Sequence, residues 1–270
     1  MRFVFLITGR KALPFAKRCI DSILRQQKEF SFDWLYVDDA SEYSRTEKEF
    51  LLSLMEGKVL FLGKRHYQVG AIHQGIQKIE DPYSIICLID GDDYLLGDAL
   101  NYIAKVYENP DIAMTYGNVL LDFRPYQDPM SHYFSDKKTV NTEYSDMIWR
   151  TQSFREDGFR CFHLRTFRRW LWDYIDPKGF CRRDGTPIRA SGDSAFMYPM
   201  LELLGDKKHV MFIDTPLYVY RLHMGNVHNH DKKSQTEDLE YIRFELSPYS
   251  PINRLELQGR LNQAKDLIKE

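Results

Sequence analysis

The sequence has no apolar run that approaches the roughly 20 residues needed to span a bilayer. Its first apolar stretch is short and is followed by Arg10 and Lys11, which is not the pattern of a secretory signal peptide. We therefore expect a soluble, cytoplasmic protein. Peripheral contact with a membrane is compatible with this expectation.

A basic excess, paired cysteines and internal repeats are also missing. The formal net charge of -2 argues against a dedicated nucleic-acid binder, which normally carries a basic surplus. The cysteines are far apart and form neither a CxxC pair nor a zinc-binding spacing; they are Cys19, Cys87, Cys161 and Cys181. We expect reduced thiols and no nucleic-acid partner.

Short apolar runs recur through the first half of the chain. They begin near Phe3, Trp34, Val59, Ile85 and Ala113. Their separation is close to the roughly 30 residues of one strand–helix–strand unit, and the segments between them carry apolar residues at helical spacing. The pattern predicts an α/β domain with a mostly parallel sheet flanked by helices.

The second half of the chain is less regular. Residues 122–146 predict a long irregular connection. A helix is predicted from residues 191–193 onward, with a kink at Pro199, and a strand near residues 210–213. Residues 252–270 have helical periodicity and predict a surface helix packed on its own domain. A docking or self-association helix is the alternative.

Four residues, Asp90-Gly91-Asp92-Asp93, directly follow the apolar run at residues 84–89. Ligands of open α/β sheets bind just beyond such strand ends. Carboxylate oxygens at this spacing suit a hard divalent cation, which commonly neutralises phosphate. An EF-hand is excluded, because Leu95 occupies the position of its required glycine. The cluster predicts a site for a metal-bound phosphorylated ligand.

Asp38 and Asp39 end the second apolar run and are expected at the same edge of the sheet. A carboxylate there could accept a hydrogen bond from a uracil N–H or a ribose hydroxyl. A solvated turn is an equal alternative for this pair.

Three further side chains have functional interpretations beside structural ones. Asp193 precedes an apolar helical series and predicts a helix N-cap, or a general base that deprotonates a hydroxyl nucleophile. Arg221 has the paired N–H groups that bind phosphate, and His223 can complete a metal site. A solvated loop is the alternative for the histidine.

Residues 149–183 combine aromatic and basic side chains. Aromatic rings can stack on sugar faces, and arginines can bind an anionic acceptor. His163, Arg165 and Arg168 are the first candidates for acceptor contacts. A packed subdomain with a solvated basic rim is an equal alternative.

In their order and spacing, these features resemble the family 2 glycosyltransferases with the GT-A fold, over roughly residues 1–228. The resembling parts are an opening strand and helix, a VDDAS turn, a stretch before the metal strand, a DxD motif, a base position and a closing segment. They are Phe3–Ile7 with Cys19–Ile23, Val37–Ser41, Gln68–Gly70, Leu88–Asp93, Gly192–Asp193 and Pro216–His223.

Two positions depart from the family pattern. Thr8-Gly9-Arg10-Lys11 follows the first strand where the family usually has Tyr-Asn, and Gly192 replaces the usual Glu before the base. The sequence has no QxxRW motif, which argues against the processive synthase subgroup.

The resemblance implies an inverting, hexosyltransferase-like enzyme that moves a sugar from a nucleoside diphosphate donor, with a UDP-sugar expected, to an acceptor hydroxyl. It implies a GT-A domain at residues 1–230, with a nucleotide-sugar half at 1–120 and an acceptor half at 121–230. A helical tail at 231–270 is expected to follow and could form a homo-oligomer. The acceptor is expected to be a glycan, a lipid-linked molecule or a protein.

The resemblance also implies roles for single residues. Asp193 is the expected base, and Mn²⁺ or Mg²⁺ is the expected cofactor. The implied metal-binding residues are Asp90, Asp92, Asp93 and His223. The implied nucleotide-binding residues are Thr8, Gly9, Arg10, Asp38, Asp39, Lys64, Gln68, Asp90, Gly91 and Arg221.

Two other functions are weighed against this one. A sugar nucleotidyltransferase normally needs a glycine-rich phosphate loop early in the chain, and Gly9 is a single glycine there. A non-catalytic carbohydrate- or nucleotide-binding protein would keep the fold with a dead site, which the carboxylates at positions 39, 90, 92 and 193 argue against.

Overall fold

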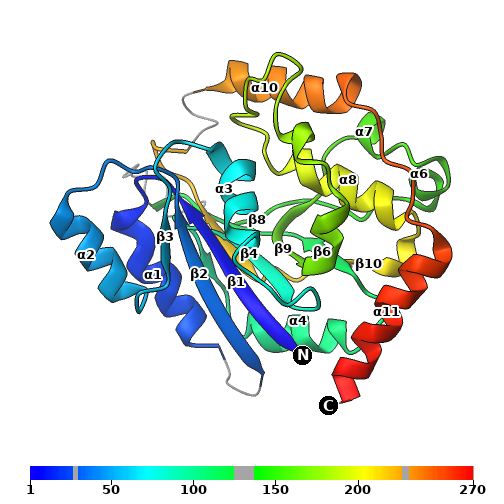
Figure 1. Ribbon diagram of the computed structural model, residues 1–270, viewed down its shortest axis with the longest axis horizontal. Coiled ribbons are helices and arrows are strands. Elements are labelled where there is room, and N and C mark those ends of the chain that lie inside the picture. The colour runs from blue at the N-terminus through cyan, green and yellow to red at the C-terminus, as the bar shows by residue number, and fades with distance from the viewer. Residues whose placement is uncertain (27–29, 125–136, 227–230, 270) are drawn as a thin grey trace.

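A computed structural model describes residues 1–26, 30–124, 137–226 and 231–269. Its centre is a seven-stranded sheet in the order β10-β6-β9-β4-β1-β2-β3 (Figure 1). Its strands are β1 Arg2–Gly9, β2 Ser31–Asp38, β3 Val59–Phe61, β4 Ile85–Asp90, β6 Met114–Gly117, β9 Phe162–Arg168 and β10 Val210–Ile213. β1 is parallel to both β2 and β4, and β2 is parallel to β3. The predicted, mostly parallel sheet is confirmed.

Helices cover both faces of this sheet, so β1 is apolar along almost its whole length. Phe3 and Phe5 share one core with α1, α2 and α4, whereas Val4 and Leu6 share the other with α3. The helices are α1 Leu13–Leu24, α2 Arg45–Leu54, α3 Tyr67–Ile76 and α4 Ala99–Tyr107. The alternation follows from the two-residue period of a strand.

A smaller sheet brings the loop after β4 next to a distant segment. Its order is β5-β11-β7-β8. These strands are β5 Tyr94–Leu95, β11 Tyr218–Arg221, β7 Leu120–Asp122 and β8 Lys137–Lys138. Because β11 pairs with β5, the Asp90–Asp93 loop lies beside residues 218–221. Of the predicted irregular connection at 122–146, residues 125–136 lie outside the described part of the chain.

Most aromatic side chains of residues 149–183 are buried in the core, which favours the packed-subdomain alternative for them. β9 enters the central sheet antiparallel to both β4 and β6. Trp170 and Trp172, in the 3₁₀ helix η2 (Arg169–Tyr174), are buried. The alternative of a packed subdomain describes these aromatic side chains.

The helix predicted from residues 191–193 is α8 (Ser194–Leu204), which runs through Pro199. It packs against the short helix α7 (Phe154–Asp157), which in turn contacts α6 (Asp146–Thr151); both lie beside α8 in Figure 1.

The C-terminal segment packs on the same domain. It comprises α10 (Lys232–Glu240), the π-helix η5 (Tyr241–Glu245) and α11 (Arg254–Lys269). Leu257 and Leu261 of α11 join the same core as α8 and Ala264 is also buried, whereas Leu255 is 84% exposed. The predicted helix is confirmed, and its buried face includes Leu257.

Two kinds of feature are absent from the described residues: a membrane-spanning helix and a disulfide bond. None of the helices there combines the length and apolar character that crossing a bilayer requires. The four cysteines are free thiols.

A buried ion pair ties α7 to α8. The Arg155 guanidinium donates to both oxygens of Glu202, at 2.5 and 2.8 Å, and to the carbonyls of Ile242 and Leu246. Both side chains are almost fully buried, at 3% and 2% exposure. Removing one partner leaves an uncompensated charge in the core.

Glu202→Gln should therefore lower the free energy of unfolding by about 3–5 kcal/mol, measured by urea denaturation. Glu49→Gln, in the exposed Arg45–Glu49 pair of α2, is the matched control and should leave it unchanged. Equal stabilities for the two variants would contradict the assignment.

Candidate functional site

A cleft of about 470 Å³ opens at the carboxyl ends of β1, β2 and β4. Most of the predicted site residues line it. They are Thr8, Gly9, Arg10, Asp39, Gln68, Asp90, Asp92, His163, Arg165 and Asp193. Residues that are up to 185 positions apart in the chain thus meet at one edge of the sheet, as expected for parallel strands.

Seven other predicted residues do not line this cleft. Asp38 is buried and accepts a hydrogen bond from the Ser41 N–H at 2.9 Å. Lys64 is exposed in the loop before α3. The Gly91 N–H donates to the Thr8 carbonyl, and a side chain there would meet the Tyr36 hydroxyl. Asp93, Arg168, Arg221 and His223 are the remaining four.

The register of β9 places the Arg168 side chain on the face of the sheet that is turned away from the cleft. It is 2% exposed, donates from Nε to the Ile112 carbonyl and lies 5.2 Å from the centre of the Tyr107 ring. His163 and Arg165 differ by two positions and share the cleft face, whereas Arg168 is on the opposite face. The prediction of an acceptor contact for Arg168 is corrected.

Asp93 faces the interior rather than a metal. Its carboxyl group accepts from the Tyr218 hydroxyl at 2.8 Å and from the Arg221 N–H at 2.7 Å. It is fully buried, and burial raises the pKa of Asp93 well above its ordinary value, helped by Asp92 and Asp90. Asp93 thus fastens β11 beneath the loop that carries the other two carboxylates.

The Arg221 guanidinium also supports this loop from behind. It lies over the Phe15 ring at 4.6 Å and donates to the backbone carbonyls of Asp92 and Phe15. Arg221 is 5% exposed. The sequence predicts a phosphate contact for this side chain, but the structure gives it a backbone-holding role.

Asp92 and His223 form the pair that could hold a divalent cation. His223 Nε2 lies 2.8 Å from Asp92 Oδ2, and Asp92 lines the cleft. The carboxylate oxygen suits Mn²⁺ or Mg²⁺ when phosphate oxygens supply other ligands, and a neutral imidazole is a common ligand of protein-bound metals. In the described ranges no group of three or more such side chains could hold a metal ion. The donor set fits a cation that binds together with its phosphorylated ligand.

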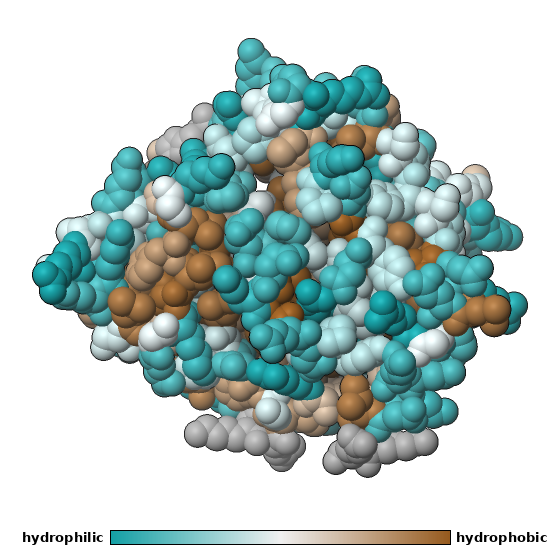
Figure 2. Space-filling view, viewed as in Figure 1, coloured by the Kyte–Doolittle hydropathy of each residue, from teal (hydrophilic) through white to brown (hydrophobic). Residues whose placement is uncertain are grey.

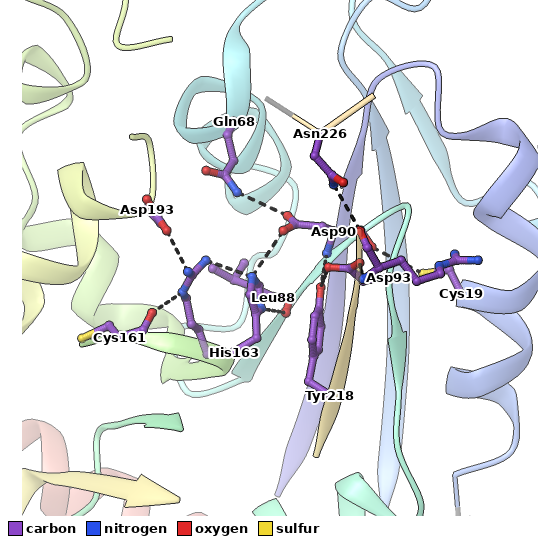
Figure 3. A network of polar contacts seen from close by, with 12 residues as sticks. Cys19, Gln68, Leu88, Asp90, Asp93, Cys161, His163, Asp193, Tyr218 and Asn226 are labelled. Atoms are coloured by element: carbon purple, nitrogen blue, oxygen red, sulfur yellow. Dashed lines mark hydrogen bonds and ion pairs between the residues drawn. The ribbon is translucent and has the colours of Figure 1, made fainter. Parts of the chain in front are cut away.

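A row of polar contacts crosses the floor of the cleft (Figure 3). Gln68 Nε2 donates to Asp90 at 3.3 Å, and Asp90 Oδ2 lies 3.3 Å from His163 Nε2. Arg165 Nη1 donates to the same nitrogen at 2.9 Å, and Arg165 Nη2 donates to Asp193 Oδ2 at 2.7 Å. In Figure 3, Asp193 and Asp93 lie on either side of Asp90.

His163 is the neutral member of this row. Its burial, and then the nearby Arg165 charge, lower the pKa of His163 below its ordinary value. A neutral ring with its proton on Nδ1 donates to the Leu88 carbonyl at 3.2 Å and accepts from Arg165 at Nε2. The ring also stacks on Tyr218 at 4.3 Å. These contacts fix the ring under the cleft.

Asp193 is both the predicted N-cap and a cleft residue. Its Oδ1 accepts from the Ser194 N–H at 2.9 Å, and its Oδ2 accepts from Arg165. Arg165 itself is held by the Cys161 carbonyl at 2.6 Å, so the carboxylate has a fixed neighbour. A quarter of the Asp193 side chain is exposed to the cleft.

The cleft also includes residues that the sequence does not predict as site residues, among them Arg65, Tyr67, Arg189 and Gln235. The Arg65 and Arg189 guanidinium carbons lie 4.2 and 5.9 Å from the centre of the Tyr67 ring. Tyr67 has a left-handed φ of 60°, which is unusual for an aromatic residue. No local pattern marks these residues, because tertiary packing brings them to the cleft.

Asp39 holds Tyr67 in this conformation. Its two carboxylate oxygens accept the backbone N–H groups of His66 and Tyr67, at 2.6 and 2.9 Å. The same side chain lines the cleft. Asp39 therefore has a structural partner besides any ligand.

The sequence model of glycosyl transferase family 2 matches residues 5–175, which contain β2, β3, β4 and β6 and both Asp90 and Asp92. The chain belongs to this family. It is therefore a glycosyltransferase. The family match favours this function over those of a nucleotidyltransferase and of a non-catalytic binding protein. No curated protein sequence matches the chain significantly.

Solved structures of S. aureus TarS share the family's GT-A fold. TarS 1-349 aligns with a TM-score of 0.58 at 14% identity, over 97% of this chain and 69% of that one. TarS 1-349 in complex with UDP-GlcNAc aligns with a TM-score of 0.62 at 15% identity, over 98% and 71%. A longer TarS structure is covered over 43% of its length, at 13% identity and a TM-score of 0.58.

Gly192, which replaces the family's usual Glu, is required by close packing. A Cβ at this position would lie 2.9 Å from the Val69 nitrogen and 3.2 Å from the Gln68 side chain. Gly192→Ala should therefore cost about 1–3 kcal/mol in the free energy of unfolding.

Gly259→Ala in α11 is the matched control, because no atom lies within 4 Å of its added Cβ. It should stabilise the protein by roughly 0.5–1 kcal/mol. Chemical denaturation measures both variants, and a Gly192→Ala variant as stable as wild type would show that the segment can shift without cost.

Proposed function

We propose that this glycosyltransferase moves a sugar from a UDP-sugar to an acceptor hydroxyl with inversion at the anomeric carbon. The observation that supports the proposal is that Asp39, Asp90, Asp92 and Asp193 line a single cleft. A complex of TarS with UDP-GlcNAc and another with UDP are consistent with a uridine nucleotide donor.

The donor would bind over the ends of β1, β2 and β4. Asp39 would orient the uracil, and Asp90 would contact the ribose. Thr8, Gly9 and Arg10 lie at the end of β1, where they would contact the nucleotide.

A diphosphate beside Asp90 and Asp92 would meet negative charge, so a counter-ion is needed there. Asp92 and His223 would hold Mn²⁺ or Mg²⁺, which when bound offsets the charge that grows on the departing UDP. Asp93 and Arg221 would keep the loop in place without touching the ligand, because both are engaged behind it.

Asp193 would act on the acceptor side. It would accept the proton of the acceptor hydroxyl while that oxygen attacks the anomeric carbon from the face opposite UDP. The Arg165 guanidinium holds the carboxylate in position, and Arg189 and Gln235 line the adjoining part of the cleft. We propose that the acceptor, whether a glycan, a lipid-linked molecule or a protein, enters beside these two residues.

The first test is the base. Asp193→Asn should lower the transfer rate by at least about 10²–10⁴-fold, because general base catalysis contributes that much. The dissociation constant for UDP, measured by calorimetry, should stay near that of wild type. Asp184→Asn, an exposed residue in the loop before α8, is the control. A wild-type transfer rate in the Asp193 variant would remove this residue from the role.

The second test is the cation. A panel of nucleotide sugars should show donor hydrolysis with Mn²⁺ or Mg²⁺ and much less with EDTA. Asp92→Asn and His223→Ala should each weaken UDP binding in the presence of metal by at least roughly 10–100-fold. With EDTA, the variants and wild type should bind UDP equally. Metal-independent UDP binding by wild type would contradict the assignment.

A further inference from the structure

The segment that carries Asp193 is held between two helices. Gly192 packs against the first turn of α3, where Val69 leaves no space for a side chain. On the other side the Ser191 hydroxyl donates to the Gln235 carbonyl of α10 at 3.0 Å. Residues 189–193 therefore depend on α10 for one wall of their site.

A single buried carboxylate makes the main contact from α10. Asp238 Oδ2 accepts the backbone N–H groups of Arg189 and Ala190, at 2.7 and 3.0 Å. Its Oδ1 accepts from Arg182 Nη2 at 2.6 Å and from Nε at 3.1 Å. Asp238 is 1% exposed, and all these donors are needed to offset its burial.

The apolar contact of α10 is limited, and Leu239 provides it by packing, partly buried, against the core. Asp238 is the fully buried residue of the helix, and Figure 2 shows mostly hydrophilic residues over the helix at the top of the view. Besides Leu239, polar contacts with the segment that leads into α8 thus attach the helix to the domain.

We propose that Asp238 is a positioning residue for glycosyl transfer, which fixes the Arg189–Asp193 segment so that the Asp193 carboxylate reaches the acceptor. The inference rests on the proposed role of Asp193 as the base. Arg165 holds the carboxylate itself, and Asp238 holds the backbone four residues upstream. α10 lies beyond the residues matched by the family model, so this chain completes its cleft with a C-terminal helix outside that region.

Asp238→Asn tests the proposal with almost no change in volume. The amide must turn a donor toward either Arg182 or the two backbone N–H groups, so one set of hydrogen bonds is lost. The value of kcat should fall roughly 10–100-fold, because small displacements of a reacting group cost that much. The KM for the donor sugar nucleotide should stay unchanged, since the nucleotide residues are on β1, β2 and β4.

Glu237→Gln is the matched control. It removes the same charge from the neighbouring residue, which faces the same Arg182 at 3.7 Å but accepts from neither backbone N–H. Its kcat should equal that of wild type. If both variants lose kcat equally, or if Asp238→Asn raises the donor KM with kcat unchanged, the proposal is overturned.

Hydrogen exchange gives a readout that does not need transfer activity. In Asp238→Asn the amides of Arg189 and Ala190 should exchange faster, while those of β1 and β4 keep their protection. Unchanged exchange at 189–190 overturns the proposal even if no nucleotide sugar is a substrate, whereas absent transfer by wild type defeats the proposed function alone.

Ser191→Ala is the substitute test if the Asp238→Asn variant does not fold, because it removes the second contact with α10 without disturbing a buried charge. It should lower kcat several-fold at constant donor KM, with the amides of 189–193 less protected. Wild-type kcat and protection in this variant would count against the proposal.

Discussion

The concentration of carboxylates at one edge of a parallel sheet is the constraint on which this structure depends. Such an edge repels itself and any phosphorylated ligand unless cations or hydrogen-bond donors face each carboxylate. In this chain a different partner faces each of these carboxylates. Arg165 faces Asp193, Tyr218 and the Arg221 backbone face Asp93, and His223 faces Asp92.

These partners come from segments that follow the first half of the sheet. Arg165 and His163 are on β9, the antiparallel strand inserted beside β4, and Arg221 and Tyr218 are on β11. The first half of the chain therefore assembles the acidic edge, and the second half neutralises and orders it. Glycosyl transfer needs both, because the proposed base and the strand that supports it belong to the later part.

The sequence predicts the first part of this arrangement well, since its strands are continuous apolar runs at regular intervals. It predicts which acidic groups gather but not which member of an adjacent pair faces the cleft. Asp39 and Asp92 line the cleft, whereas Asp38 and Asp93 turn inward. Asp38 is the last residue of β2, and Asp92 and Asp93 lie in the turn after β4, so the regular alternation of a strand does not decide which of them faces the cleft.

The two-residue period of a strand places Arg165 and Arg168 on opposite faces of the sheet. This period can be applied only once β9 is known to be a strand. The mixed aromatic and basic composition of β9 and its surroundings conceals that. Arg65, Tyr67, Arg189 and Gln235 are beyond local prediction, because loops and a distant helix bring them together.

The Asp39 carboxylate has a consequence for how substitutions there should be interpreted. It anchors the backbone of His66 and Tyr67 and thereby keeps a strained turn in place beside Arg65. Replacing it releases that turn as well as deleting the hydrogen-bond acceptor that we propose for the uracil. Any affinity lost by such a variant would therefore combine loop reorganisation with loss of the proposed base contact, and it would overstate the strength of the direct contact.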